Sequence, residues 1–337
     1  MASPVGDEER CRTRGSDSIV AIDWAAGGQL LAATLDGEVL VNGGWRRGPG
    51  GEDGNSGSEL VAACWSAPST PVVASTGGHV SILDDGHPAG RGWRRSIEAG
   101  EPILDIVASR AGVVAAHGEA ITVASEDSTA EPLALKVGRL RALVAVSGSY
   151  AVAVGADGAA FVDTAFGALD GRIELDGALS IAVDGSGEHL AIGDVAGSIQ
   201  VLRIGHQLNG RELTGYPDPV RLLAWTDRPF GVVALADDEL TFWHHRAGEV
   251  AESPISATVG GAPLCALAAA PFGSLVATGD VDGRVDVWSL HALGRPVWRA
   301  VPLGGEITVL RWSPDGARLA AGTTKGDVAV WSRRSIV

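Results

Sequence analysis

An internal repeat constrains the fold of this chain more than any other feature. Its clearest copies are residues 275–288 and 319–331; each contains a short apolar segment, a turn with glycine, and a segment of alternating apolar residues. A unit of this size cannot bury its own apolar face, so consecutive copies must stack on one another. The repeat therefore predicts an array of similar small sheets.

The repeat can be followed eight times along the 337 residues. Its turn residues are Gly37, Gly78, Glu119, Gly158, Gly197, Asp238, Gly283 and Gly326, at intervals of 41, 41, 39, 39, 41, 45 and 43 residues. Such an interval is typical of a propeller blade with four antiparallel strands. After each turn, apolar residues recur at every second position, which predicts a strand with one buried face.

Two more strands are predicted before each turn. The nearer strand is short and almost continuously apolar, as in 30–33 and 319–321, which suits a strand covered on both faces by neighbouring blades. The farther strand, as in 19–24 and 60–65, is rich in alanine and valine. Small side chains of this kind suit the crowded wall of a central channel.

Several short phrases in these repeats resemble the WD-repeat β-propeller family. They are clearest at 312–316 (Trp-Ser-Pro-Asp-Gly), at Asp282-Gly283 and at 287–289 (Val-Trp-Ser), and the pattern extends over essentially the whole chain. The resemblance implies a propeller that binds other proteins. The family's Gly-His dipeptide before the first strand is missing, since that approach reads, for example, Gly304-Gly305. We therefore expect blade cohesion to depend more on packing than is usual in the family.

The number of strands predicts how the ring closes. The last repeat ends at 331–337, just after its third strand, so its outer strand must come from elsewhere. We predict that the N-terminal segment 1–17 supplies it, through the strand at 9–14, which removes the open edges of the ring. The predicted fold is thus all-β: one domain over 1–337, an eight-bladed propeller of four-stranded antiparallel blades closed by the N-terminal strand. Seven blades with one degenerate repeat is the alternative.

No sequence feature indicates a membrane protein or an enzyme. No apolar run has the roughly 18–20 residues needed to cross a bilayer, and the first 20 residues are polar, which predicts a cytoplasmic protein. The three cysteines are too scattered for disulfides or zinc, and the eight histidines lack metal-ligand spacing. With no nucleophile elbow or phosphate loop either, we expect no catalytic residues, no metal and no cofactor.

The net charge limits the class of partner. The chain has 26 Lys and Arg against 41 Asp and Glu, a formal net charge of −15. Nucleic acid would have to be bound by a local basic patch. The Arg-Arg pairs at 46–47, 94–95 and 333–334 are better explained as arginines whose aliphatic stems cover neighbouring tryptophans. We therefore predict protein partners rather than nucleic acid or membrane.

Carboxylates predict where those partners bind. In a propeller, the turns between second and third strands and the loops between blades emerge on one face. The predicted partner-binding residues there are Asp36, Asp157, Asp237, Asp280 and Asp282 in turns, with Glu52 and Asp53 in the first inter-blade loop. A ring of carboxylates attracts a basic peptide or a cation, although Asp before Gly is also good turn chemistry.

Two hypotheses of different class follow. The first is a non-catalytic scaffold or adaptor that binds partner proteins through its loop faces, with basic segments at the acidic face, or that serves as the regulatory subunit of an enzyme complex. The alternative is a propeller enzyme of hydrolase or lyase type with a cation at the channel mouth.

Overall fold

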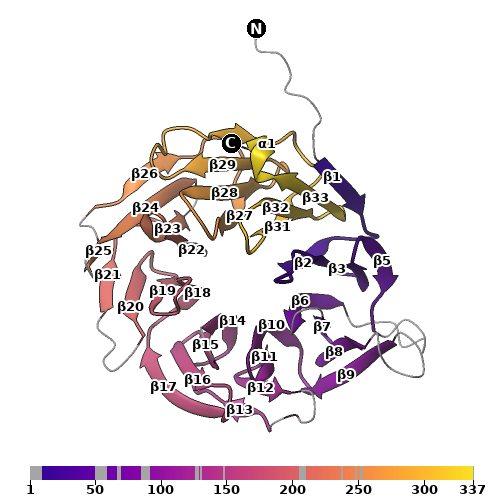
Figure 1. Ribbon diagram of the computed structural model, residues 1–337. Coiled ribbons are helices and arrows are strands. Elements are labelled where there is room, and N and C mark those ends of the chain that lie inside the picture. The colour runs from indigo at the N-terminus through magenta and orange to yellow at the C-terminus, as the bar shows by residue number, and fades with distance from the viewer. Residues whose placement is uncertain are drawn as a thin grey trace.

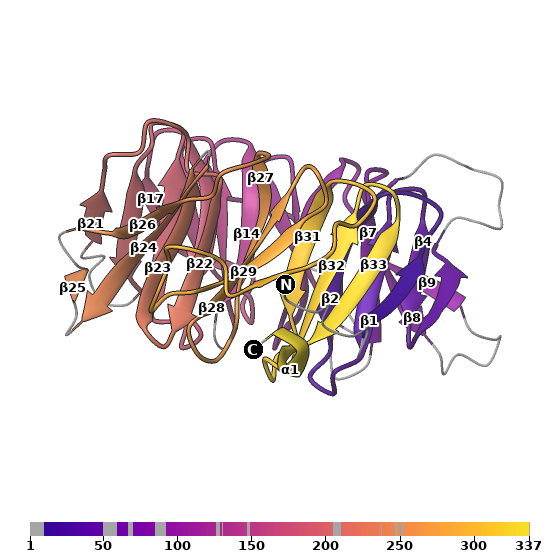
Figure 2. The same cartoon turned by 90° about the horizontal axis from the view of Figure 1, so that it is seen from above.

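The computed structural model is a ring of β-sheets arranged radially around an axis (Figure 1). It describes residues 10–49, 59–66, 70–84, 92–125, 129, 131–146, 149–204, 210–236, 238–246, 249–250 and 253–336. Within these ranges there are eight antiparallel sheets, each forming one blade. Figure 2 shows the ring from its side: the strands run from one flat face to the other, so the turns gather on two faces.

Blades 1 to 4 each have four strands in simple sequence order. Their bounds are: blade 1, β2 (Ile19–Trp24), β3 (Leu30–Thr34), β4 (Glu38–Val41) and β5 (Gly44–Arg47); blade 2, β6 (Leu60–Ser66), β7 (Thr70–Ser75), β8 (His79–Asp84) and β9 (Gly92–Glu98); blade 3, β10 (Ile103–Ser109), β11 (Gly112–His117), β12 (Ala120–Ala124) and β13 (Leu133–Ala134); blade 4, β14 (Leu140–Val146), β15 (Tyr150–Gly155), β16 (Gly158–Asp163) and β17 (Ala168–Glu174).

Blades 5 to 8 complete the ring. Their bounds are: blade 5, β18 (Ala178–Val183), β19 (His189–Asp194), β20 (Ile199–Arg203) and β21 (Gly210–Leu213); blade 6, β22 (Leu222–Asp227), β23 (Phe230–Ala236), β24 (Glu239–Arg246), β25 (Glu249–Val250) and β26 (Ile255–Thr258); blade 7, β27 (Leu264–Ala269), β28 (Leu275–Asp280), β29 (Val285–Ser289) and β30 (Trp298–Arg299); blade 8, β31 (Ile307–Trp312), β32 (Arg318–Thr323), β33 (Asp327–Ser332) and β1 (Arg10–Arg14).

The N-terminal strand closes the ring, as the strand count predicts. β1 pairs antiparallel with β33, with Arg12 opposite Ala329, and lies beside it in Figure 1. The eight-bladed prediction and the closure are therefore confirmed, and the seven-bladed alternative is wrong. Residues 1–9 of the predicted closing segment lie outside the described residues.

Glycine makes the repeated turns possible. Gly283 and Gly326 have φ angles of 82° and 80°, in the left-handed region. A Cβ atom on Gly283 would lie 2.5 Å from the carbonyl oxygen of Gly305, and one on Gly326 would lie 2.6 Å from that of Gly15. Each turn thus packs directly against an inter-blade connection, which leaves no room for a side chain.

The core lies between adjacent blades. In the cluster that joins blades 1 and 8, Ile19 and Ile22 of β2 pack with Ala320 of β32 and Val328 of β33, and all four are almost fully buried. The continuous apolar character of the second strands is thus explained by cover on both faces. Burial of apolar surface of this kind stabilises the folded state by roughly 25 cal/mol for each Å² removed from water.

Tryptophans at the ends of innermost strands add hydrogen bonds between blades. Their indole Nε1 atoms donate to backbone carbonyls of the preceding blade: Trp24 to Arg311 at 3.2 Å, Trp225 to Ala182 at 3.0 Å and Trp312 to Ala268 at 3.2 Å. Blade cohesion, which we expected to depend more on packing than is usual in the family, thus also uses hydrogen bonds between blades. Trp65 holds the corresponding place in β6, but its buried Nε1 has no hydrogen-bond partner among the described residues.

Three local features depart from the simple blade. The outer position of blade 6 is divided between β25 and β26, which both pair with β24. β22 begins at Leu222, although the apolar pattern of this first strand starts at Val220. The four-residue helix α1 (Arg333–Ile336) follows β33. In the described ranges, no helix has the length and apolar character needed to cross a bilayer.

Candidate functional site

One face of the ring carries the turns between second and third strands together with the inter-blade loops, and we call it the turn face. Hydrogen bonds fasten the two together: Gly48 N donates to Gly37 O at 2.7 Å, and Leu303 N donates to Gly283 O at 2.8 Å. The predicted common face therefore exists, because each turn is bonded to a loop beside it. The turns between first and second and between third and fourth strands lie on the opposite face.

The predicted partner-binding residues that the structure describes lie on the turn face but do not form one cluster. Asp36 is in the β3–β4 turn of blade 1, Asp157 in the β15–β16 turn of blade 4 and Asp282 in the β28–β29 turn of blade 7, and all three are exposed. No two of these blades are neighbours, so the carboxylates form a sparse rim. The predicted residues Asp237, Glu52 and Asp53 lie outside the described residues.

Further exposed carboxylates occupy the same face. Asp238 precedes β24 in blade 6, Glu101 lies in the loop between blades 2 and 3, and Glu306 lies between blades 7 and 8. The rim is thus acidic on several blades. Its spacing suits an extended partner that touches several turns rather than a single small ion.

Asp36 is held by its own turn. Burial disfavours its charged form, but hydrogen bonds from Ser16, Thr34 and the backbone outweigh that effect and lower the pKa of Asp36. The Thr34 hydroxyl donates to Asp36 Oδ1 at 2.7 Å. Asp36 is therefore a fixed negative charge at neutral pH, and it also stabilises the turn.

Asp280 differs from Asp36, Asp157 and Asp282 because it is only 7% exposed. Its Oδ1 atom accepts backbone hydrogen bonds from Asp282 N at 3.0 Å and Arg284 N at 2.8 Å. Asp194 of blade 5 binds the N–H groups of Ala196 and Ser198 in the same way. Both carboxylates thus bind N–H groups of their own turns. This is the turn-forming role that the sequence analysis gave as the alternative to partner binding.

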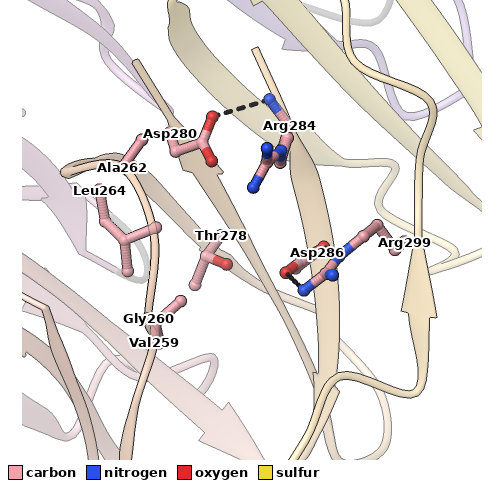
Figure 3. Close-up of a pocket in the computed structure, with 9 residues that line it drawn as sticks. All are labelled: Val259, Gly260, Ala262, Leu264, Thr278, Asp280, Arg284, Asp286 and Arg299. Carbon is pink, nitrogen blue, oxygen red and sulfur yellow. Dashed lines mark hydrogen bonds and ion pairs between the residues drawn. The ribbon is translucent and has the colours of Figure 1, made fainter. Parts of the chain in front are cut away.

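A small pocket opens beside Asp280, between blade 7 and the loop that leads into it (Figure 3). It is lined by Val259, Gly260, Ala262, Leu264, Thr278, Asp280, Arg284, Asp286 and Arg299. Arg299 forms a two-pronged ion pair with Asp286, with both N–O distances 2.7 Å. The Arg284 side chain has no ion pair with a described residue, so an unpaired cation lies within the acidic rim.

The innermost strands carry charged residues that the sequence analysis missed. Arg311 Nε of β31 lies 3.8 Å from Asp23 Oδ1 of β2, and Asp23 Oδ2 accepts a hydrogen bond from Trp65 N at 3.0 Å. Burial raises the pKa of Asp105 in β10 to about 6, against the opposing effects of Ile106 and Leu143 backbone N–H groups and of Arg311. Asp23 and Arg311 thus join blades 1, 2 and 8, whereas burial makes the charged form of Asp105 unfavourable in the folded ring.

A pair of histidines on the opposite face was also missed. The rings of His189 in blade 5 and His245 in blade 6 lie 4.9 Å apart, and Phe230 contacts both at 5.2 Å. Asp184 Oδ2 lies 3.3 Å from His189 Nδ1. As the alternation of a strand predicts, the neighbouring His244 points away from this cluster and packs on Phe242.

The thiols of blades 2 and 7 have no features of reactive groups. Burial raises the pKa of Cys64 and raises that of Cys265 to about 12, which keeps both protonated. Among the residues that the structure describes, no three His, Cys, Asp or Glu side chains are grouped so that they could hold a metal ion. The described residues of the site therefore offer charged and polar groups for contacts at the surface.

Comparison with known proteins agrees with the repeat pattern. The family model described as WD domain, G-beta repeat matches residues 255–289 and 302–332, which contain the clearest phrases of the sequence. No curated protein matches the chain.

Solved propellers share the fold over almost the whole chain. The computationally designed Ika8 protein is 20% identical, with a TM-score of 0.69, covering 95% of this chain and 97% of its own. The Dos1 propeller is 13% identical, with a TM-score of 0.74 and coverages of 96% and 94%. Sqt1 of Chaetomium thermophilum, solved bound to the N-terminus of ribosomal protein L10, is 15% identical, with a TM-score of 0.74 and coverages of 94% and 97%. Identities this low show the fold alone.

Proposed function

The chain is a WD-repeat β-propeller, and from this premise we propose that it is a non-catalytic scaffold that binds partner proteins through its turn face. WD-repeat propellers are generally not enzymes and generally bind other proteins. The structurally similar Sqt1 was solved with the N-terminus of a ribosomal protein. A rigid ring that presents many turns suits such a role, because binding residues commonly lie on loops held by a stable scaffold.

The acidic rim of the turn face favours a partner segment that is basic. Exposed carboxylates on blades 1, 4, 6 and 7 give the turn face a negative field, and a basic peptide would be attracted to it in a salt-dependent way. The wide spacing of Asp36, Asp157 and Asp282 favours an extended peptide that crosses the face. A regulatory role in an enzyme complex would use the same contacts.

The electrostatic part can be tested with a matched pair of variants. The probe is fluorescein-labelled octalysine, with octaglutamate as the negative control, and the readout is anisotropy at several salt concentrations. Asp157→Asn with Asp282→Asn changes the turn face, whereas Glu188→Gln with Asp227→Asn makes the same change in net charge on the opposite face. We expect the first double variant to bind about threefold to tenfold more weakly with a flatter salt dependence, and the second to bind like the parent.

Two outcomes contradict the proposal. Equal weakening in both double variants would show that only the total charge matters and would remove the role of the turn face. A stoichiometric divalent cation in the purified protein, measured by elemental analysis, would favour the enzyme alternative over the scaffold.

A further inference from the structure

A rigid turn on the opposite face presents the most exposed aromatic side chain of the described chain. Phe166, between β16 and β17 in blade 4, is 84% exposed. Asp163 Oδ1 accepts hydrogen bonds from Ala165 N at 2.9 Å and from Phe166 N at 3.3 Å. Thr164 fastens the turn to the preceding one, since its backbone N and its hydroxyl both donate to Ser149 O, at 2.6 and 2.7 Å. The turn therefore holds Phe166 in the solvent.

Two more exposed apolar residues lie at the same edge. Tyr150 is 37% exposed and stands opposite Asp163 in the β15–β16 ladder, and Leu169 is 40% exposed at the start of β17. We call Tyr150, Phe166 and Leu169, with the carboxylates of Asp163 and Asp170, the blade 4 patch. Apolar residues scattered singly on a surface are ordinary, whereas exposed apolar residues gathered in one region are common at contact surfaces.

The patch itself carries two carboxylates, and one arginine lies in the adjacent turn of blade 3. The carboxylates of Asp170 and then Asp163 lie near the Tyr150 hydroxyl and raise its pKa. Asp170 is exposed and forms no ion pair with a described cation. The adjacent turn of blade 3 holds the exposed Arg110, next to Ser109, whose Oγ accepts a hydrogen bond from Thr164 at 3.1 Å.

We propose that the blade 4 patch binds a partner segment that carries an apolar side chain next to lysine or arginine. The apolar side chain would cover Phe166 and Leu169, and the cation would lie near Asp170. A second copy of this chain would bring the same carboxylates against one another, and an anionic bilayer would be repelled by them, so charge favours a basic peptide. This surface is on the opposite face and does not depend on the function proposed for the turn face.

The test uses a library of random 12-residue peptides displayed on phage and selected on the full chain. Selected peptides are then measured against Phe166→Ser and against a matched control, Phe272→Ser. Phe272 is 55% exposed in the β27–β28 turn on the same face, but its carbonyl accepts a hydrogen bond from Arg333 at 3.2 Å, so its surroundings are basic. Melting curves confirm that both variants fold, which is expected because both side chains are exposed.

We expect peptides that pair an apolar residue with Lys or Arg, that bind Phe166→Ser at least about tenfold more weakly and that bind Phe272→Ser unchanged. Asp170→Asn should weaken them about twofold to fivefold at low salt and less at high salt. The proposal is overturned if no peptide depends on Phe166, or if the dependent peptides lack basic residues. It is also overturned if sedimentation shows a dimer that Phe166→Ser abolishes. Binding to phosphatidylserine vesicles that Phe166→Ser abolishes would overturn it as well.

Discussion

Arg12 donates two hydrogen bonds to the carboxylate of Asp327, 315 positions later in the chain, with Nε–Oδ1 and Nη2–Oδ2 distances of 3.0 and 2.6 Å. The Asp327 side chain is 3% exposed and that of Arg12 is 43% exposed. Blade 7 contains an analogous pair between Arg299 and Asp286 on two of its own strands. The N-terminal strand thus completes blade 8 with the same chemistry that an uninterrupted blade uses.

The first prediction concerns this closure. Arg12→Gln leaves the buried carboxylate of Asp327 without its charged partner, so we expect a loss of about 2 kcal/mol in the free energy of unfolding. Arg14→Gln is the control, because exposed Arg14 donates to the backbone carbonyl of Lys325 at 3.1 Å and forms no ion pair with a described carboxylate. Guanidinium unfolding at neutral pH measures both. Equal stabilities of the two variants would show that the ion pair adds nothing to closure.

A second prediction compares two tryptophans in equivalent places. Trp225→Phe removes an indole N–H that donates to the Ala182 carbonyl, whereas Trp65→Phe removes an Nε1 that has no partner among the described residues. Trp225 and Trp65 are 8% and 7% exposed, so the two indoles are equally buried. We expect Trp225→Phe to be less stable than Trp65→Phe by about 1–2 kcal/mol. Urea unfolding measures the difference, and a reversed order would contradict the inter-blade role of the indole.

A third prediction concerns Asp105. Burial raises its pKa to about 6 in the folded protein, above the ordinary value of 3.8, so the folded state binds a proton more tightly than the unfolded state. Its favourable contribution is therefore full below pH 3.8 and is lost as pH rises through 6. We expect Asp105→Asn to stabilise the protein by on the order of 2 kcal/mol at pH 7.5 and by much less near pH 4.5.

Thermal melting across this pH range tests the effect, with Asp227→Asn as a control for the same chemical change at an exposed site. A gain in stability that does not depend on pH would mean that the Asp105 carboxylate is not the cause.

The sequence predicted the blades, their turns and the closing strand because these depend on local patterns repeated eight times. A residue such as Gly283 is required by its own turn, so its role can be read without knowing its neighbours. Asp23, Asp105 and Arg311 act between different blades, and a repeat pattern contains no information on which side chains meet there. Their only signal was a charge within a predicted first strand. Asp280 shows a different limit of the sequence. An aspartate that forms a turn and an aspartate that binds a partner have the same sequence context, so the sequence does not distinguish them.

The last prediction concerns the histidine pair between blades 5 and 6. Burial, reinforced by repulsion from His189 and opposed by Asp184, lowers the pKa of His245. A depressed pKa means that the unfolded state takes up the proton first, so the contribution of His245 is present above its ordinary value of 6.5 and is lost as pH falls. We expect His245→Phe, which keeps an aromatic ring without the charge, to raise the melting temperature relative to the parent by a few degrees more at pH 5 than at pH 7. His291→Gln, at an exposed site, should change the melting temperature equally at both pH values. An unaltered pH dependence in His245→Phe would assign the effect to another group, and a test of His189→Phe would then separate the two rings.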